Sequence, residues 1–253
     1  MNRDDPLPAP PPHRRPAAAS RRWRAVLRWG LVAVLVPTVL LAGSALAAIL
    51  LFARVDPPYG MAMVVATDIQ TASNRRPEWQ RLDDLPRHLM LAVIAAEDQR
   101  FPLHKGFDWK SLRQALTDHF NGGRLRGAST ISQQTSKNLF LWHERSLLRK
   151  TLEAGFTVGI ETVWPKRRIF EVYLNLAEWG PGIYGIEAAA RHYFGVPARE
   201  LDRHQAARLA AILPAPGRLN PVHPDPQLAE RIAWIERQMA QLGIAWLDPM
   251  LLE

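Results

Sequence analysis

The feature that most constrains this chain is an apolar run, residues 30–52, that contains no charged side chain. At about 1.5 Å per residue, a helix of this length crosses a hydrocarbon core of about 30 Å. Secretory signal cores are usually only about 7–15 residues long, although Ala45-Leu46-Ala47 could act as a cleavage site. We therefore expect a retained transmembrane helix over residues 29–53 rather than a cleaved signal.

The charge distribution orients this helix. Residues 1–28 carry seven arginines against Asp4 and Asp5, so most of the formal net charge of +8 precedes the apolar run. Because positive residues beside a span stay cytoplasmic, residues 1–28 are predicted to be a cytoplasmic tail, disordered in its Pro-rich part, residues 1–20. The rest of the chain is expected on the outer side of the membrane. Nucleic-acid binding is the minority interpretation of this charge, and we expect no nucleic-acid partner.

Several common kinds of catalytic site are excluded by the sequence. Cysteine is absent, so the chain has neither disulfides nor thiol catalysis. It contains no H-E-x-x-H zinc motif and no glycine loop of the Walker or dinucleotide-binding type. No serine is followed three residues later by lysine, the signature of acyl-serine transpeptidases.

Helical patterns dominate beyond the membrane and predict one mainly α domain over residues 82–253, after a connector over residues 54–81. Within the connector, residues 61–69 are expected to form a short strand. The expected helices are 86–96, 109–120, 130–142, 145–164, 166–176, 183–194, 202–213 and 226–243. Asp108 is the predicted N-cap of the second, and a capping box of Thr130 and Gln133 opens the third. The predicted core stripe of the 145–164 helix is Leu148, Leu152, Phe156, Ile160 and Val163.

Two carboxylates, Glu97 and Asp98, end an unbroken apolar segment, residues 89–96. Partial burial disfavours a charged carboxyl and raises its pKa, which can bring a general acid or base toward neutral pH. The alternative is that both side chains turn outward and only solvate the end of the helix. The segment by itself leaves both interpretations open.

A second cluster consists of Lys137, Arg145, Arg149 and Glu153. The last three are spaced i, i+4 and i+8, so they form one strip along a helix. Two guanidinium groups on one strip suit a phosphate, which arginine binds bidentately. The alternative is a ladder of surface salt bridges, each worth only about 0.2–0.5 kcal/mol.

Five segments of the chain occur in the order in which bacterial peptidoglycan glycosyltransferases of family 51 carry their motifs. They are "EDQRFPLHKGFD" (97–108), "GASTISQQTSKNLF" (127–140), "RSLLRKTLE" (145–153), "RRIFEVYLN…G…YGIEAAARHYFG" (167–195) and "AAILPAPGRLNP" (210–221). The family includes the glycosyltransferase module of bifunctional penicillin-binding proteins. With one anchor and no transpeptidase module, this chain resembles the monofunctional biosynthetic members.

The resemblance implies a lysozyme-like, all-helical fold on the periplasmic side of a bacterial inner membrane. It implies that Glu97 is the base that deprotonates the 4-hydroxyl of the acceptor sugar on lipid II. That oxygen would displace undecaprenyl pyrophosphate from the growing lipid-linked glycan, with inversion to a β-1,4 linkage. Penicillin-binding or division proteins are the candidate protein partners.

The resemblance also assigns the remaining site residues. Lys137, Arg145 and Arg149 would stabilise the leaving pyrophosphate. Glu153 matches the second essential carboxylate, which orients the sugar–phosphate or helps to hold a divalent cation, Mg²⁺ or Mn²⁺, bridged to the pyrophosphate. The other predicted substrate-site residues are Asp98, Phe101, His104, Ser129, Thr130, Gln133, Gln134 and Asn138. Capping is the alternative role for Thr130 and Gln133. The matches in the fourth motif, read mainly as scaffold, are Glu171, Tyr173, Asn175, Gly180, Tyr184 and Gly185.

Two other functions compete with this interpretation. A lysozyme-like glycan hydrolase would need a catalytic glutamate, but neither a set of cations for a pyrophosphate nor an anchor to meet a lipid substrate. An inactive membrane scaffold of cell-wall synthesis would have no need of both Glu97 and Glu153.

Overall fold

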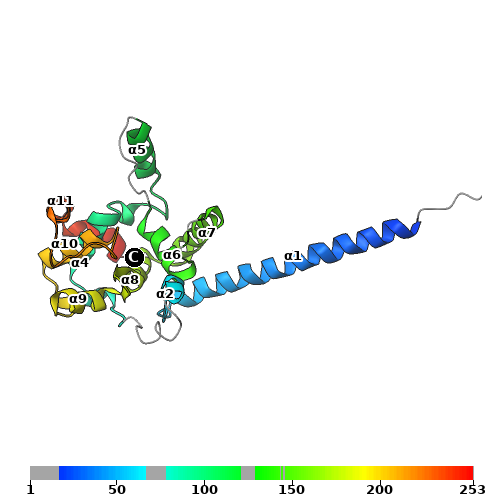
Figure 1. Ribbon diagram of the computed structural model, residues 1–253, viewed down its shortest axis with the longest axis horizontal. Coiled ribbons are helices and arrows are strands. Elements are labelled where there is room, and N and C mark those ends of the chain that lie inside the picture. The colour runs from blue at the N-terminus through cyan, green and yellow to red at the C-terminus, as the bar shows by residue number, and fades with distance from the viewer. Residues whose placement is uncertain (1–16, 67–77, 121–128, 143, 145, 253) are drawn as a thin grey trace, which may run out of the picture. The chain divides into compact units, whose positions relative to one another are not determined.

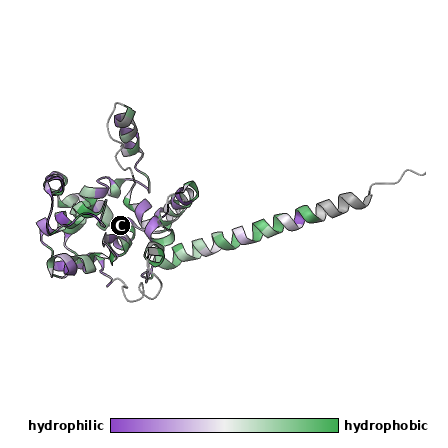
Figure 2. Cartoon of the chain, in the orientation of Figure 1, coloured by the Kyte–Doolittle hydropathy of each residue, from purple (hydrophilic) through white to green (hydrophobic). Residues whose placement is uncertain are grey.

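The computed structural model describes residues 17–66, 78–120, 129–142, 144 and 146–252. The chain divides into two compact units, Met1–Ala48 and Ile49–Glu253. Helix α1 (Ala17–Phe52) forms the described part of the first unit, and its last residues belong to the second. Its segment Val26–Phe52 has 27 residues and a mean hydropathy of 2.4, so it is long and apolar enough to cross a membrane. Figure 2 shows it coloured mostly as hydrophobic.

The interior of α1 suits an apolar surrounding. The Thr38 hydroxyl donates to the carbonyl of Val34 at 2.8 Å, and the Ser44 hydroxyl donates to that of Leu41 at 2.9 Å. Both polar groups are thus satisfied within the helix, as a hydrocarbon core requires. The helix begins earlier than expected: residues 17–20, assigned from the sequence to a disordered stretch, are its first turn, while residues 1–16 lie outside the described part.

The second unit is mainly α, as predicted (Figure 1). Its helices are α2 (Met61–Ala66), α4 (Arg87–Glu97), α5 (Trp109–Phe120), α6 (Ile131–Phe140), α7 (Leu147–Val163), α8 (Lys166–Leu176), α9 (Ile186–Phe194), α10 (Arg203–Ile212), α11 (Pro226–Leu242) and α12 (Asp248–Leu251). Short 3-10 turns lie at Leu82–Asp84, Phe101–Leu103, Ala198–Glu200 and, as η4, at Ile244–Leu247. One antiparallel hairpin joins β1 (Glu178–Gly180) to β2 (Ile183–Tyr184).

Helix α4 lies at the centre of this unit. All its residues from Leu89 to Ala95 are buried, because α10, α11 and η4 pack around it. A helix enclosed in this way is apolar on every face, which explains the unbroken apolar segment in the sequence. The helix ends where Asp98 leaves the helical conformation, with φ −161° and ψ 78°.

A second group of helices is built around α6, which packs against α2, α7 and α8. The strand predicted over residues 61–69 is wrong for residues 61–66, which form α2, while residues 67–69 lie outside the described part. Gly60, just before α2, approaches α6 so closely that an added Cβ would meet the carbonyl oxygen of Asn138 at 2.5 Å. Packing on α6 therefore prevails over the strand preference of the two valines.

The predicted caps are present. The backbone N–H of Ser111 donates to Asp108 Oδ1 at 3.0 Å at the start of α5. Thr130 and Gln133 form the reciprocal capping box of α6. Helix α6 ends at Phe140, two residues before the expected Trp142.

The core stripe predicted for α7 is confirmed at Ile160, which is buried, and at Phe156, which is partly buried and stacks on Phe140. It is wrong at Leu148, Leu152 and Val163, which are exposed, and the other buried residues of the helix are Arg149, Glu153 and Thr157. This face of the helix turns inward because α7 packs against α6, and the ion pair of Arg149 with Glu153 compensates the two buried charges.

The helix expected over residues 183–194 is also corrected. Ile183 and Tyr184 form β2, and Gly185, at φ 85°, separates this strand from α9. An L side chain rarely adopts this φ, so the glycine permits the sharp change of direction.

Candidate active site

Glu97 is the last residue of α4, and its side chain is only 11% exposed. Its Oε2 accepts a hydrogen bond from Gln134 Nε2 at 2.9 Å, and its Oε1 lies 3.7 Å from a terminal nitrogen of Arg231. Burial raises the pKa of the Glu97 carboxyl above its ordinary value, although Gln134 and Arg231 offset part of the rise. The interpretation in which Glu97 only solvates the helix end is therefore wrong. The carboxyl is enclosed, and its raised pKa makes it a stronger proton acceptor than an exposed glutamate.

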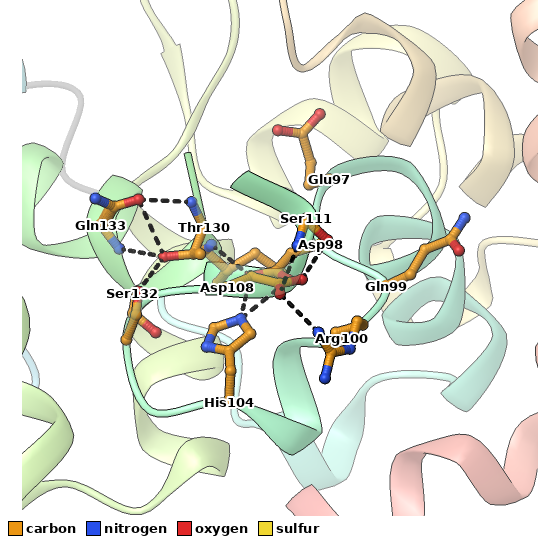
Figure 3. Close-up of polar contacts among 12 residues, drawn as sticks. Glu97, Asp98, Gln99, Arg100, His104, Asp108, Ser111, Thr130, Ser132 and Gln133 are labelled. Atoms are coloured by element: carbon orange, nitrogen blue, oxygen red, sulfur yellow. Dashed lines mark hydrogen bonds and ion pairs between the residues drawn. The ribbon is translucent and has the colours of Figure 1, made fainter. Parts of the chain in front are cut away.

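Asp98 is buried and points away from Glu97, as Figure 3 shows. Its Oδ2 accepts a hydrogen bond at 3.0 Å from the backbone N–H of Ile131, the first residue of α6, and lies 2.9 Å from His104 Nε2. A carboxylate at this position also faces the positive end of the helix dipole. Asp98 and His104 thus join the loop after α4 to the start of α6. These contacts suit the orienting role predicted for Asp98.

Two further predicted residues support the same loop from inside. Phe101 is fully buried against Phe170, with 5.7 Å between the ring centroids. The Thr130 hydroxyl donates to the carbonyl of Gly106 at 2.6 Å while it accepts the capping bond from Gln133. Phe101 and Thr130 therefore hold the loop after α4 in place.

A cavity of about 900 Å³ opens beside Glu97 on the side of α6 and α7. We call it the cationic cavity. It brings together six more of the predicted residues: Ser129, Gln133, Gln134, Lys137, Arg149 and Glu153. Ser146, Leu147, Lys150, Leu213 and Pro214 complete its wall. Asn138 is half-buried on α6 and is not part of this wall, and Arg145 lies outside the described residues.

Glu153 holds two cations of this wall in place. Arg149 Nη1 donates to Glu153 Oε2 at 2.7 Å, with the two side chains 10% and 4% exposed. Lys150 forms an ion pair with the other carboxylate oxygen. A ladder of surface salt bridges is therefore the wrong interpretation of Arg149 and Glu153, because this pair is buried. Lys150 was missed from the sequence, although its i, i+3 spacing to Glu153 could have indicated it.

The cations of the cavity are arranged so that they could bind an anion. Arg149 Nε is buried and has no hydrogen-bond partner among the described residues. Burial also lowers the pKa of Lys137; Glu153 raises it and Arg149 lowers it. An unsatisfied buried donor and a desolvated ammonium are both stabilised by an anionic oxygen that enters the cavity.

A second cavity, of about 930 Å³, opens on the other side of Glu97. Glu97, Ser129, Gln134 and Pro214 line both cavities. The second one is completed by Ala96 and by a face of α11 that carries Gln227, Glu230, Arg231, Ala233, Trp234 and Arg237, and we call it the α11 cavity. The sequence predicted a helix over residues 226–243 but did not indicate that these residues belong to the site. They line the same cavity as Glu97 although more than half the chain separates them from it in sequence, and no local spacing indicates this proximity.

The residues matched to the fourth motif make mostly internal contacts. Glu171 accepts from the backbone N–H of Leu82 at 3.0 Å, and Asn175 donates to the carbonyl of Gln80 at 2.9 Å. Tyr173 reaches further: its hydroxyl lies 3.5 Å from Gln134 Oε1, the amide that binds Glu97. Burial, with Glu97 and Asp98 nearby, raises the Tyr173 pKa well above its ordinary value, so this hydroxyl stays protonated.

No group of three metal-binding side chains (His, Cys, Asp or Glu) occurs within the described part of the chain. Glu153 is the carboxylate proposed for a cation, and both its oxygens are in ion pairs with Arg149 and Lys150. A divalent cation that bound there would therefore need most of its oxygen ligands from the substrate.

The geometry places one enclosed carboxyl group, that of Glu97, between two cavities, one of which is lined by cations. Comparisons with known proteins identify the family. The transglycosylase family model matches residues 64–240. A biosynthetic peptidoglycan transglycosylase of Chromohalobacter salexigens is 48% identical over 229 residues, which cover 88% of this chain and 96% of the relative.

Other relatives with the same name are similar to the chain. That of Marinomonas sp. is 56% identical over 173 residues, 68% of this chain and 77% of the relative. That of Ectopseudomonas mendocina is 53% identical over 192 residues, 74% of this chain and 79% of the relative. The chain belongs to the transglycosylase family, and the resemblance found from its five motifs is confirmed.

Proposed function

We propose that this protein polymerises lipid II into β-1,4-linked glycan strands and releases undecaprenyl diphosphate. The family and the names of its relatives support a peptidoglycan glycosyltransferase. The observation that carries the proposal is the position of Glu97, enclosed between the cationic cavity and the α11 cavity. A transferase, unlike a simple binding protein, needs one base within reach of two substrates.

In the proposed reaction, Glu97 accepts the proton of the acceptor's 4-hydroxyl as its oxygen forms a bond to the donor's anomeric carbon. The bond from that carbon to the pyrophosphate oxygen breaks, and the oxygen leaves with the electron pair. A single displacement of this kind inverts the anomeric centre. Positioned proton transfer contributes about 10²–10⁴-fold to such a step.

The cationic cavity suits the leaving group. Lys137, Arg149 and Lys150 lie where the developing negative charge of a pyrophosphate could be stabilised, and Glu153 fixes two of them. A role for Arg145 remains a prediction from the motif. A divalent cation also remains a proposal: Glu153 could contribute one ligand and the pyrophosphate oxygens the others.

The substrate is lipid-linked, so we place the protein in the bacterial inner membrane, with the catalytic domain on the periplasmic side. The apolar helix Val26–Phe52 supports an anchor, and the arginines before it support the orientation. Leu147, at the wall of the cationic cavity, is 90% exposed, and Leu148 is 65% exposed. Side chains of this kind suit contact with lipid. Penicillin-binding or division proteins are proposed partners on the resemblance alone.

The decisive experiment supplies purified protein with labelled lipid II in detergent and, separately, with intact sacculi. Glycan polymer supports the proposed synthase. Shortened sacculi would show a hydrolase, and no change in either substrate would show a scaffold. Glu236→Gln is a matched control for Glu97→Gln, because Glu236 lies on α11 and pairs with His204 away from both cavities. The control should polymerise lipid II at the wild-type rate.

A further inference from the structure

Arg231 connects three parts of the site through one guanidinium group. Its Nε donates to the carbonyl of Ala211 at 3.0 Å, in the last turn of α10. One of its terminal nitrogens donates to the carbonyl of Ala96 at 3.4 Å, in the last turn of α4, and lies 3.7 Å from Glu97 Oε1. Arg231 lies on α11, outside the five motifs that indicated the family.

The surroundings of Glu97 explain why a cation is needed there. Glu97 is the last residue of α4, where unpaired carbonyls form the negative end of the helix dipole. A carboxylate is destabilised at such an end, and burial adds to the effect. The guanidinium of Arg231 binds a terminal carbonyl of α4 and faces the carboxylate. Its positive charge therefore counters the negative potential of the helix end and replaces part of the solvation that the buried carboxylate has lost.

We propose that Arg231 is a positioning residue for Glu97: held by the carbonyls of Ala96 and Ala211, its guanidinium keeps the Glu97 carboxylate ionised and directed between the two cavities. The inference deepens the proposed function and rests on it. Arg231 acts through Glu97 and needs no contact with the substrate.

The other polar groups around Glu97 do not replace this role. From α6, Gln134 donates a neutral hydrogen bond, and Lys137 faces Glu97 from the cavity assigned to the pyrophosphate. Asp98, the next residue, opposes ionisation of Glu97, and Tyr173 of α8 stays protonated.

The remaining elements around α4 do not supply such a charge either. On α10, which also packs against α4, Arg208 is directed to the carbonyls of Pro221 and Val222, and η4 carries no charged side chain. Glu230 and Arg237 line the α11 cavity, and Arg149, Lys150 and Glu153 line the cationic cavity.

Two substitutions separate the charge of Arg231 from its geometry. Arg231→Gln removes the charge but keeps an N–H donor for a carbonyl. In a plot of kcat/KM against pH, the midpoint of the acid limb should then move to higher pH by about one unit. An opposite charge at this distance lowers a carboxyl pKa by about that amount or more. Arg231→Lys keeps the charge but cannot bind two carbonyls and face a carboxylate as a fork does. Its acid limb should stay near that of the wild type while its plateau falls by about tenfold or more.

The test measures lipid II polymerisation by the full-length protein in detergent from about pH 5 to about pH 9, with circular dichroism to check folding. Arg237→Gln is the matched control. It removes an arginine from the same helix and the same cavity, but within the described residues Arg237 makes no ion pair with Glu97. Its acid limb should coincide with that of the wild type, whatever the effect on KM. An acid limb of folded Arg231→Gln that coincides with the wild type would overturn the inference.

A second readout does not depend on activity. The side-chain carboxyl carbon of Glu97 can be titrated by NMR and assigned by comparison with Glu97→Gln. Its midpoint should be higher in Arg231→Gln than in the wild type, and equal midpoints would overturn the inference even if the wild type makes no polymer. Absence of polymer from the wild type would instead reject the proposed function. If Arg231→Gln does not fold, Arg231→Lys decides: a lowered plateau at an unchanged Tm supports the inference, and a wild-type plateau rejects it.

Discussion

The two buried glutamates of the site, Glu97 and Glu153, show how the same side chain acquires different properties. Glu97 stands at the end of a helix and, within the described part of the chain, accepts one side-chain hydrogen bond and has one cation at 3.7 Å. Glu153 lies within a helix, and each of its oxygens is in an ion pair. Burial is therefore only partly compensated at Glu97, whose pKa is raised, whereas Glu153 holds a cation at each of its oxygens. Neighbouring charges, and not burial alone, distinguish the two carboxyl groups.

The largest expected effect is the loss of polymerisation in Glu97→Gln. Gln has nearly the same shape but cannot accept the proton, so the rate should fall by about 10²–10⁴-fold. Lipid II binding and folding should be retained, which a binding assay and a circular dichroism spectrum can check. A rate within tenfold of the wild type would remove Glu97 from the role of base.

The next effect in size tests the cations that Glu153 organises. Arg149→Ala should slow polymerisation by at least about 10²-fold if its guanidinium meets the leaving pyrophosphate. Arg149→Lys should remain impaired, because an ammonium does not reproduce two parallel donors. Rates close to the wild type, with only a slightly lower Tm, would instead make Arg149 a structural partner of Glu153.

Local patterns in the sequence were sufficient to predict where Glu97 lies, while its role as a base was predicted only from the family resemblance. Residues 89–96 had to form a buried helix, and Glu97 had to be at its end. The spacing of Arg149 and Glu153 likewise indicated one helical face. Each of these inferences used contacts within a few residues along the chain.

The predictions from the sequence were wrong or incomplete where the structure depends on contacts between residues that are far apart along the chain. Two sets of residues on α7 have helical spacing, and only the position of α6 decides that the set with Arg149 and Glu153 is buried. Residues 61–66 are helical because they pack on α6, and Arg231 approaches Glu97 only through the packing of α11 on α4. Tertiary contacts of this kind leave no period in the sequence.

A smaller effect is expected from the exposed leucines near the cationic cavity. Leu147→Ser with Leu148→Ser should slow polymerisation several-fold on liposomes, because about 25 cal/mol is lost for each Å² of apolar surface that no longer meets lipid. In detergent, where the substrate is not held in a bilayer, the loss should be smaller, because only the contact of Leu147 with the cationic cavity is then changed. Equal rates for both proteins on liposomes would contradict a lipid contact at these residues.

The comparison of the two glutamates is tested most directly by the Tm values of the wild type, Glu97→Gln and Glu153→Gln at neutral pH. Because the pKa of Glu97 is raised in the folded state, its carboxylate destabilises the fold at pH values above that pKa, and the destabilisation disappears as the pH falls through it. Glu97→Gln should therefore melt no lower than the wild type. Glu153→Gln leaves buried Arg149 without its counter-charge, so it should lose about 1–3 kcal/mol, or about 2–4 °C for each kcal/mol. A Tm of Glu97→Gln as low as that of Glu153→Gln would contradict the account.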